Sequence, residues 1–179
     1  LWSGQISSSV PIQVRAVWTP LPFGVLGSAG PASFFSGFSS APVANTWYPA
    51  ALANKLAGRD LAPSSQDINA NFSSAFPNWY FGTDGDTPPG QYDFVSVVLH
   101  ELGHGLGFAG SMQVDNLEIG SWGDFGPGVP TRPFIYDRFA ANRNGQRLIN
   151  TGLFPNPSAA LGAQLTSNNL FFDGANAVA

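Results

Sequence analysis

The sequence predicts an α+β domain, because it combines segments with strand periodicity and segments with helix periodicity. Residues 9–18 and 66–72 alternate apolar and polar side chains, as half-buried strands do. Residues 93–107 carry apolar side chains around much of a helical circumference, which predicts a core helix. We expect a twisted sheet of mainly N-terminal strands to pack on this helix and on a second helix at residues 49–57.

Length and composition limit the class of protein. The 179 residues suit a single domain, with an N-terminal part, 1–107, and a loop-rich C-terminal part, 108–179. Apolar residues make up 44% of the chain, enough for a sizeable core. Charged residues make up only 10% and the net charge is −4, which argues against a nucleic-acid partner. No apolar run approaches the roughly 18 residues of a membrane span. Cysteine is absent, which excludes disulfides and thiolate metal sites.

Local signals mark each N-terminal element. Residues 23–46 are rich in Gly, Ser, Ala and Pro, and predict a long irregular connection. The helix at 49–57 begins with a proline and ends at Gly58, a typical left-handed cap. Residues 79–81 predict a short third strand, and residues 82–90 predict a loop.

The core helix is expected to begin near Asp93. Glycine is a poor helix former, so Gly105 or Gly107 should end the helix in a left-handed turn. Residues 120–133 predict a loop, and residues 134–140 predict a strand or a short helix.

The core helix carries the sequence His100-Glu101-Leu102-Gly103-His104, which holds both histidines of the chain. Residues four apart share one face of a helix, so His100 and His104 can point at one metal ion. Glu101 lies about 100° further round. Two imidazoles that hold Zn²⁺ and an adjacent carboxylate that accepts a proton from water are typical of a metallopeptidase. We therefore predict that the chain hydrolyses peptide bonds in a protein or peptide substrate.

A structural reading of the two histidines is the alternative: surface histidines, or core histidines satisfied by hydrogen bonds. Packing alone explains poorly why three glycines accompany the motif, since each costs about 1 kcal/mol relative to alanine. They are explained if backbone or substrate must approach the helix closely. A tyrosine, Tyr136 or Tyr80, could donate a hydrogen bond to the developing oxyanion.

A third zinc ligand is not evident. Catalytic zinc normally has three protein ligands, and the chain has no further histidine. A third ligand within the chain must be a carboxylate or, as the weaker alternative, a tyrosine. The carboxylates downstream of the motif are candidates, and each is also explained as a loop or capping residue: Asp115, Glu118, Asp124, Asp137 and Asp173. None is favoured over the others.

Residues 100–107 resemble the zincin metallopeptidases, and in particular the metzincin and snapalysin-like pattern. In that family the glycine corresponding to Gly107 lets the chain turn toward a third ligand three residues later. That position here is Gly110, which has no side chain. The family's Met-turn is not matched by Met112, the only methionine, because it follows the helix too closely. Glu118 is similarly too near for a thermolysin-like ligand.

More of the chain resembles the front part of longer secreted bacterial zincin-like proteins. There, a block like residues 165–172 precedes a Ser-His segment and a Met-Pro turn. This resemblance implies that the third ligand and the Met-turn lie beyond Ala179. Low charge, a single lysine and the peptidase motif together predict a processed, secreted bacterial protein that acts outside the cell. The zincin resemblance implies that the strand at 68–72 is an edge strand that binds the substrate backbone. The alternative is an ordinary core strand, and both interpretations can hold together.

Two alternatives remain open. The chain could be a zincin-fold binding or structural module without catalysis, since the third ligand is missing; Glu101 argues against this, because a structural site needs no base. Asp84-Gly85-Asp86, with Asp93 nearby, could offer oxygen ligands to a structural Ca²⁺. Turn chemistry explains the same residues, and we favour the turn.

Overall fold

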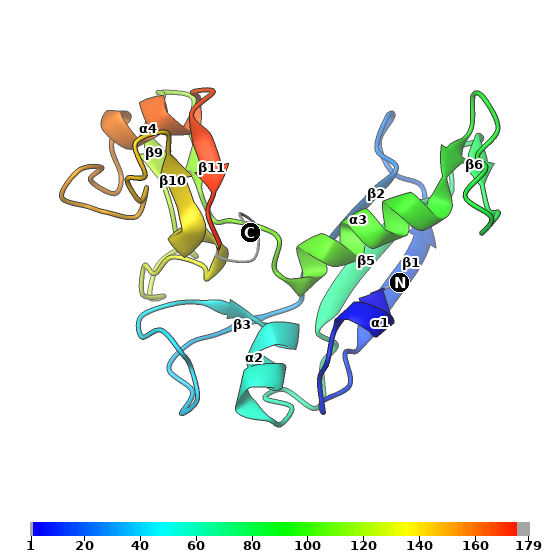
Figure 1. The fold of residues 1–179 in the computed structure, drawn as a ribbon, viewed down its shortest axis with the longest axis horizontal. Helices are drawn as coiled ribbons and strands as arrows, with labels where there is room; N and C mark the ends of the chain where they lie inside the picture. The colour runs from blue at the N-terminus through cyan, green and yellow to red at the C-terminus, as the bar shows by residue number, and fades with distance from the viewer. Residues whose placement is uncertain (1, 175–179) are drawn as a thin grey trace. The chain divides into compact units, whose positions relative to one another are not determined.

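The computed structural model describes residues 2–174 and divides into two compact units (Figure 1). Unit 1 comprises Leu1–Ala41 and Pro49–Phe108, and unit 2 comprises Pro42–Tyr48 and Ala109–Ala179. Helices and strands are mixed along the chain, in agreement with the α+β class. The division after Phe108 lies one residue beyond the expected boundary of the N-terminal part. That the two units make one domain stays a prediction.

A three-stranded sheet of order β1-β5-β2 forms the base of unit 1. Its strands are β1 (Val14–Thr19), β2 (Gly27–Pro31) and β5 (Ile68–Ser73). β1 runs parallel to β5 and β2 runs antiparallel to it. The strands expected at 9–18 and 66–72 are therefore present. β1 begins later than expected: directly before it, the Gln13 N–H donates to the Asp67 carboxylate rather than to a neighbouring strand.

Two expectations about this sheet are wrong. Residues 23–46 are not wholly irregular, because they contain β2 and the short β3 (Phe34–Phe35). β2 reads Gly-Ser-Ala-Gly-Pro, so pairing with β5 forms this strand rather than intrinsic propensity. β5 is not an edge strand either, because it lies between β1 and β2. The antiparallel edge strand of the sheet is β2.

The expected core helix is α3 (Phe94–Leu106), which lies along the sheet and contacts β2 and β5 (Figure 1). It is less buried than expected, because only Glu101, Gly103 and Gly105 of this helix are buried and its apolar side chains are half-buried. Asp93 caps its N-terminus by accepting hydrogen bonds from the backbone N–H groups of Val95 and Ser96. Gly107 ends it in a left-handed conformation with φ 116°. The second helix, α2 (Ala50–Ala57), also matches expectation and ends at Gly58 with φ 65°. It contacts α3 and β3.

Short elements complete unit 1. These are α1 (Trp2–Gln5), β4 (Tyr48–Pro49) at the boundary between the units, β6 (Trp79–Tyr80) and β7 (Tyr92–Asp93). β6 pairs in parallel with β7, which leads directly into α3. The expected third strand is thus present, and the loop that follows it connects β6 to β7.

Unit 2 has its own small core, formed by Trp122, Leu148, Phe154 and Leu161. Its strands form two antiparallel pairs: β8 (Gln113–Val114) with β9 (Gly120–Ser121), and β10 (Ala140–Asn142) with β11 (Leu170–Phe172). The segment 134–140 contains a 3₁₀ helix, η1 (Tyr136–Phe139), directly before β10. The helix α4 (Ala159–Leu165), capped by Ser158, was not expected in a loop-rich region. Within residues 2–174, no helix is long and apolar enough to span a membrane.

Candidate metal centre

The C-terminal half of α3 brings the two histidines together. The Nε2 atoms of His100 and His104 lie 3.1 Å apart, and their rings are perpendicular, with centroids 4.6 Å apart. This is the result of their four-residue spacing on one helix face. Both imidazole edges therefore point toward the same place, as the sequence predicted.

A hydrogen bond to the backbone fixes the orientation of the His104 ring. Its Nδ1 donates a hydrogen bond to the backbone carbonyl of Phe108 at 2.8 Å. A carbonyl oxygen can only accept, so Nδ1 carries the proton and Nε2 of the neutral ring keeps its lone pair. The left-handed turn at Gly107 brings that carbonyl over the ring, with the Phe108 N–H bonded back to the carbonyl of Gly103. This backbone acceptor could not be identified from the sequence, because it is not a side chain.

The distance between the two Nε2 atoms fits two ligands of one zinc ion. Zn–N bonds are about 2.0–2.1 Å, so two nitrogens of a tetrahedral site lie about 3.3 Å apart. The hydrogen bond from His104 Nδ1 to a carbonyl is the supporting contact that zinc-binding histidines usually make. His100 and His104 can therefore supply two of the ligands that a zinc site needs.

Glu101 lies in a groove beside the histidines. Only 8% of its surface is exposed. The groove has a volume of about 490 Å³ and is lined by residues 24–27 on one side and by four residues of α3 on the other: Ser96, Val97, His100 and Glu101. A Cβ at Gly27 would lie 3.0 Å from Glu101 Cγ, so the start of β2 packs directly on the carboxylate side chain.

Sequence reasoning missed residues 24–27 as part of this groove. They lie far upstream of the motif, in the segment that was expected to be irregular. A glycine beside the apolar pair Val25-Leu26 is the only signal they carry, and it is a weak one.

The glycine between the second histidine and the end of α3 has the role expected of it. A Cβ at Gly105 would lie 2.3 Å from Ile68 Cγ2, a side chain that is only 1% exposed. Glycine at this position lets α3 approach β5 closely. The prediction that backbone must come near the motif is confirmed at this position.

The carboxylates considered as third ligands all belong to unit 2, and most have partners within that unit. Asp115 accepts hydrogen bonds from the backbone N–H groups of Leu117 and Ile119. Asp124 accepts one from Gly126, and Asp173 forms an ion pair with Arg147. These contacts are those of loop residues. The third ligand stays unassigned among them.

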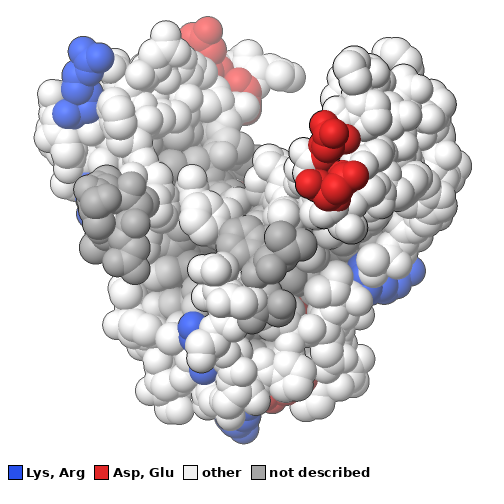
Figure 2. Space-filling view, turned by 45° about the vertical axis from the view of Figure 1, so that its right-hand side comes forward, with Lys and Arg blue, Asp and Glu red and all other residues white. Residues whose placement is uncertain are grey.

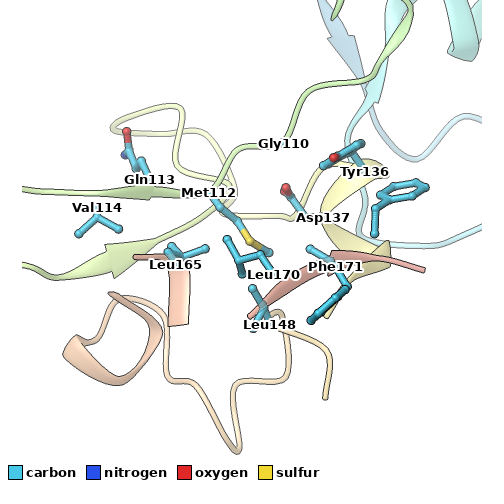
Figure 3. Close-up of a pocket in the computed structure, with 12 residues that line it drawn as sticks. Gly110, Met112, Gln113, Val114, Tyr136, Asp137, Leu148, Leu165, Leu170 and Phe171 are labelled. Atoms are coloured by element: carbon cyan, nitrogen blue, oxygen red, sulfur yellow. The ribbon is translucent and has the colours of Figure 1, made fainter. Parts of the chain in front are cut away.

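Asp137 is fully buried and makes its hydrogen bonds inside unit 2 (Figure 3). Its carboxylate accepts hydrogen bonds from the backbone N–H and the hydroxyl of Ser111, at 2.9 and 2.5 Å, and from the N–H of Phe134 at 2.7 Å. Burial raises the pKa of Asp137, and these three hydrogen bonds offset part of that rise. Its oxygens are occupied by these donors rather than free for a metal.

Gly110 and Met112 also have local explanations. A Cβ at Gly110 would lie 2.7 Å from Asp137 Oδ1, so the position where the zincin pattern has a ligand is crowded here. Figure 3 shows Met112 pointing toward Leu165, Leu148 and Leu170 in a cavity of about 450 Å³ within unit 2. Met112 packs against the core of this unit.

The carboxylates considered for calcium are engaged in local contacts. Asp84 accepts hydrogen bonds from the Tyr80 hydroxyl at 2.7 Å and from the Asp86 N–H. The Tyr80 hydrogen bond lowers the pKa of Asp84, and it raises the pKa of Tyr80. Asp93 caps α3, and its pKa is lowered chiefly by the Ser96 hydroxyl. These contacts support the turn interpretation. Tyr80, one candidate oxyanion donor, uses its hydroxyl in this loop.

Within residues 2–174, no three His, Cys, Asp or Glu side chains gather as a metal site would require. On the face shown in Figure 2, Lys and Arg side chains form no extended patch.

Comparison with known proteins gives one match. A family model described as SPBPB7E8-like matches residues 24–135, which include β2, α2, β5 and the whole of α3. No curated protein and no solved structure matches the chain.

Proposed function

The chain belongs to the SPBPB7E8-like family, and from the geometry of α3 we propose that it is a zinc-dependent metallopeptidase. The observation that carries the proposal is the convergence of the two Nε2 atoms, 3.1 Å apart, with His104 held by the Phe108 carbonyl. Two hydrogen-bonded surface histidines would not need a nearly buried glutamate beside them. Glu101 lies in the same groove as His100.

Each residue of the motif has one role in the proposal. His100 and His104 hold the ion through neutral imidazoles. When bound, zinc acts as a Lewis acid and makes water nucleophilic near neutral pH. Glu101 accepts the proton of the attacking water and passes it to the leaving amine. The low exposure of Glu101 favours this role, because few solvent molecules compete for its carboxylate.

We also propose that unit 1 is zincin-like. Its mixed sheet has an antiparallel edge strand, β2, and the helix that carries the motif lies along that sheet. A groove separates the segment that leads into β2 from α3. Secretion and a protein or peptide substrate belong to the same proposal.

Metal content measured together with proteolysis tests the proposal. The purified full-length protein should hold about one zinc per chain by mass spectrometry and hydrolyse casein, and a chelator should abolish that hydrolysis. His104→Ala should lose both zinc and activity. A protein without stoichiometric zinc, or one whose activity survives the chelator, would contradict the proposal.

The second candidate function is a zincin-fold module that binds without catalysis. The observation in its favour is that residues 2–174 contain no cluster of three metal-ligating side chains. It predicts zinc-independent folding and no hydrolysis of casein, with His104→Ala as stable as the parent chain.

A further inference from the structure

A second groove of unit 1 adjoins the groove that holds Glu101. It has a volume of about 600 Å³ and lies between the segment 21–26 and residues 73–78, with Tyr92 at one end. Its walls include Leu21, Phe23, Val25, Ala75 and Phe76, and none of the residues that line it is charged. We call this the outer groove, and the groove beside Glu101 the inner groove.

The outer groove has a defined shape. The Val25 N–H is bonded to the Pro22 carbonyl at 3.0 Å, across a turn in which Gly24 has φ 82°. The ring of Phe76 contacts the ring of Tyr92 edge-on, with centroids 5.2 Å apart. At the tip of the turn, the side chain of Phe23 is fully exposed. Phe23 therefore extends the apolar surface of the groove, and contiguous exposed apolar surface marks interaction sites.

The two grooves lie next to each other. Residues 24–26 line both of them, so one segment forms a shared wall. Tyr92 lies in β7, just before α3, and lines the outer groove, whereas Ser96 and His100 lie in α3 and line the inner groove. From Phe94 to His100 the helix rises about 9 Å at about 1.5 Å per residue, and the two extended residues before it add up to about 6 Å, so Tyr92 and His100 are about 9–15 Å apart along the chain direction. An extended peptide covers that distance with three or four residues.

We propose that the outer groove binds a bulky apolar or aromatic side chain of an extended peptide substrate. That side chain lies three or four residues from the bond that is cleaved. This inference rests on the proposed metallopeptidase function, and it adds a substrate preference to it. The uncharged, aromatic-lined walls exclude a preference for charged side chains. Burial of a Phe or Leu side chain in a groove that remains partly open raises affinity by about tenfold.

Matched peptides test the preference. The zinc-loaded full-length protein is given peptides that differ only in Phe or Ser at the third and fourth positions on either side of the cleaved bond. We expect kcat/KM to be about tenfold higher for Phe on one side. Phe23→Ser removes the apolar side chain at the rim and Ala75→Trp fills the groove, so each should reduce the preference to less than about threefold. Leu117→Ser, which alters an exposed apolar residue in unit 2, should retain it.

A binding measurement separates this inference from the proposed function. Fluorescence anisotropy of the same peptides, labelled and bound to Glu101→Gln, reports the groove without cleavage. If the parent chain cleaves no peptide but Phe peptides still bind more tightly, and Phe23→Ser removes that difference, the proposed function fails and the groove assignment stands. If peptides are cleaved with no preference, or Phe23→Ser leaves the preference intact, the groove assignment is overturned.

Discussion

Substitution of Gly105 by alanine tests how closely α3 must pack on the sheet. On an exposed helix this change would stabilise the protein by about 1 kcal/mol, because alanine is the better helix former. Here the new Cβ would lie 2.3 Å from Ile68 Cγ2, 2.8 Å from Cδ1 and 2.9 Å from Cγ1. Carbon atoms in good contact are about 3.5–4.0 Å apart, so the overlap exceeds about 1 Å.

The helix or the strand would have to move, and neither can do so freely. Ile68 is 1% exposed and lies in β5, between two paired strands. Overpacking of a core costs about 1–3 kcal/mol, and an overlap with three buried atoms belongs at the upper end. After the gain in helix propensity, Gly105→Ala should lower the free energy of unfolding by about 2 kcal/mol. The melting temperature should fall by about 4–8 °C.

Urea unfolding of Gly105→Ala measures this loss, and a double mutant tests its cause. Ile68→Ala removes all three atoms that the new methyl group meets. In a double-mutant cycle, the two changes should therefore be less destabilising together than their sum by about 1 kcal/mol or more. If Gly105→Ala is as stable as the parent chain or more stable, helix propensity dominates and the close approach of α3 to β5 is not as described.

Three further predictions concern the site and unit 2. Gly107→Ala should weaken zinc binding about ten- to a hundredfold in a chelator competition, because an alanine disfavours φ 116° and the supporting carbonyl would shift; an unchanged affinity would show that this turn does not hold the ligand. Gly27→Val should displace Glu101 and lower kcat/KM on casein by about tenfold or more without loss of zinc. Gly30→Val is the control on the same strand: a Cβ there meets nothing within 4 Å, so this change should have little effect on kcat/KM. Because burial raises the pKa of Asp137, the folded state binds its proton more tightly than the unfolded state, so this group's contribution to stability falls as pH rises above about 3.9. The difference in unfolding free energy between the parent chain and Asp137→Asn should therefore narrow as the pH rises above about 4, and a difference that widens would contradict the assignment.

The sequence predicted the elements whose signals are local. The helix α3 has apolar side chains at helical spacing and a terminal glycine, and it begins and ends where expected; its aspartate cap was not predicted. The same holds for α2 and its cap at Gly58. The strands β1 and β5 alternate in polarity, although their exact starts depend on neighbouring prolines and on pairing.

The elements that were missed owe their structure to distant residues. β2 has no β-branched residue and forms because five backbone positions pair with β5, from Gly27 opposite Phe72 to Pro31 opposite Ile68. Because β2 pairs with β5, β5 is the central strand of the sheet and not the edge strand that was expected. The helix α4 is short, and Ser158 caps it by accepting from the Leu161 N–H. Such a cap is hard to distinguish from a serine in a loop.

The candidate site was predictable in its side chains and not in its surroundings. Spacing alone placed His100 and His104 on one face of a helix, and their Nε2 atoms do converge. The Phe108 carbonyl and the Gly27 backbone escaped prediction because neither acts through a side chain. The contact of the Phe108 carbonyl depends on the turn at Gly107, and the contact of the Gly27 backbone depends on the position of β2.

The role of Glu101 is the most direct test of the proposed function. The chain holds one other glutamate, Glu118, so Glu101→Gln and Glu118→Gln form a matched pair of identical chemical changes. Zinc content and casein hydrolysis are measured on the same samples. Glu101→Gln should keep its zinc, but its kcat/KM should fall by about 10²- to 10⁴-fold. Glu118→Gln should keep both its zinc and its activity. If Glu101→Gln hydrolyses casein as fast as Glu118→Gln does, Glu101 is not the base and the proposed mechanism is wrong.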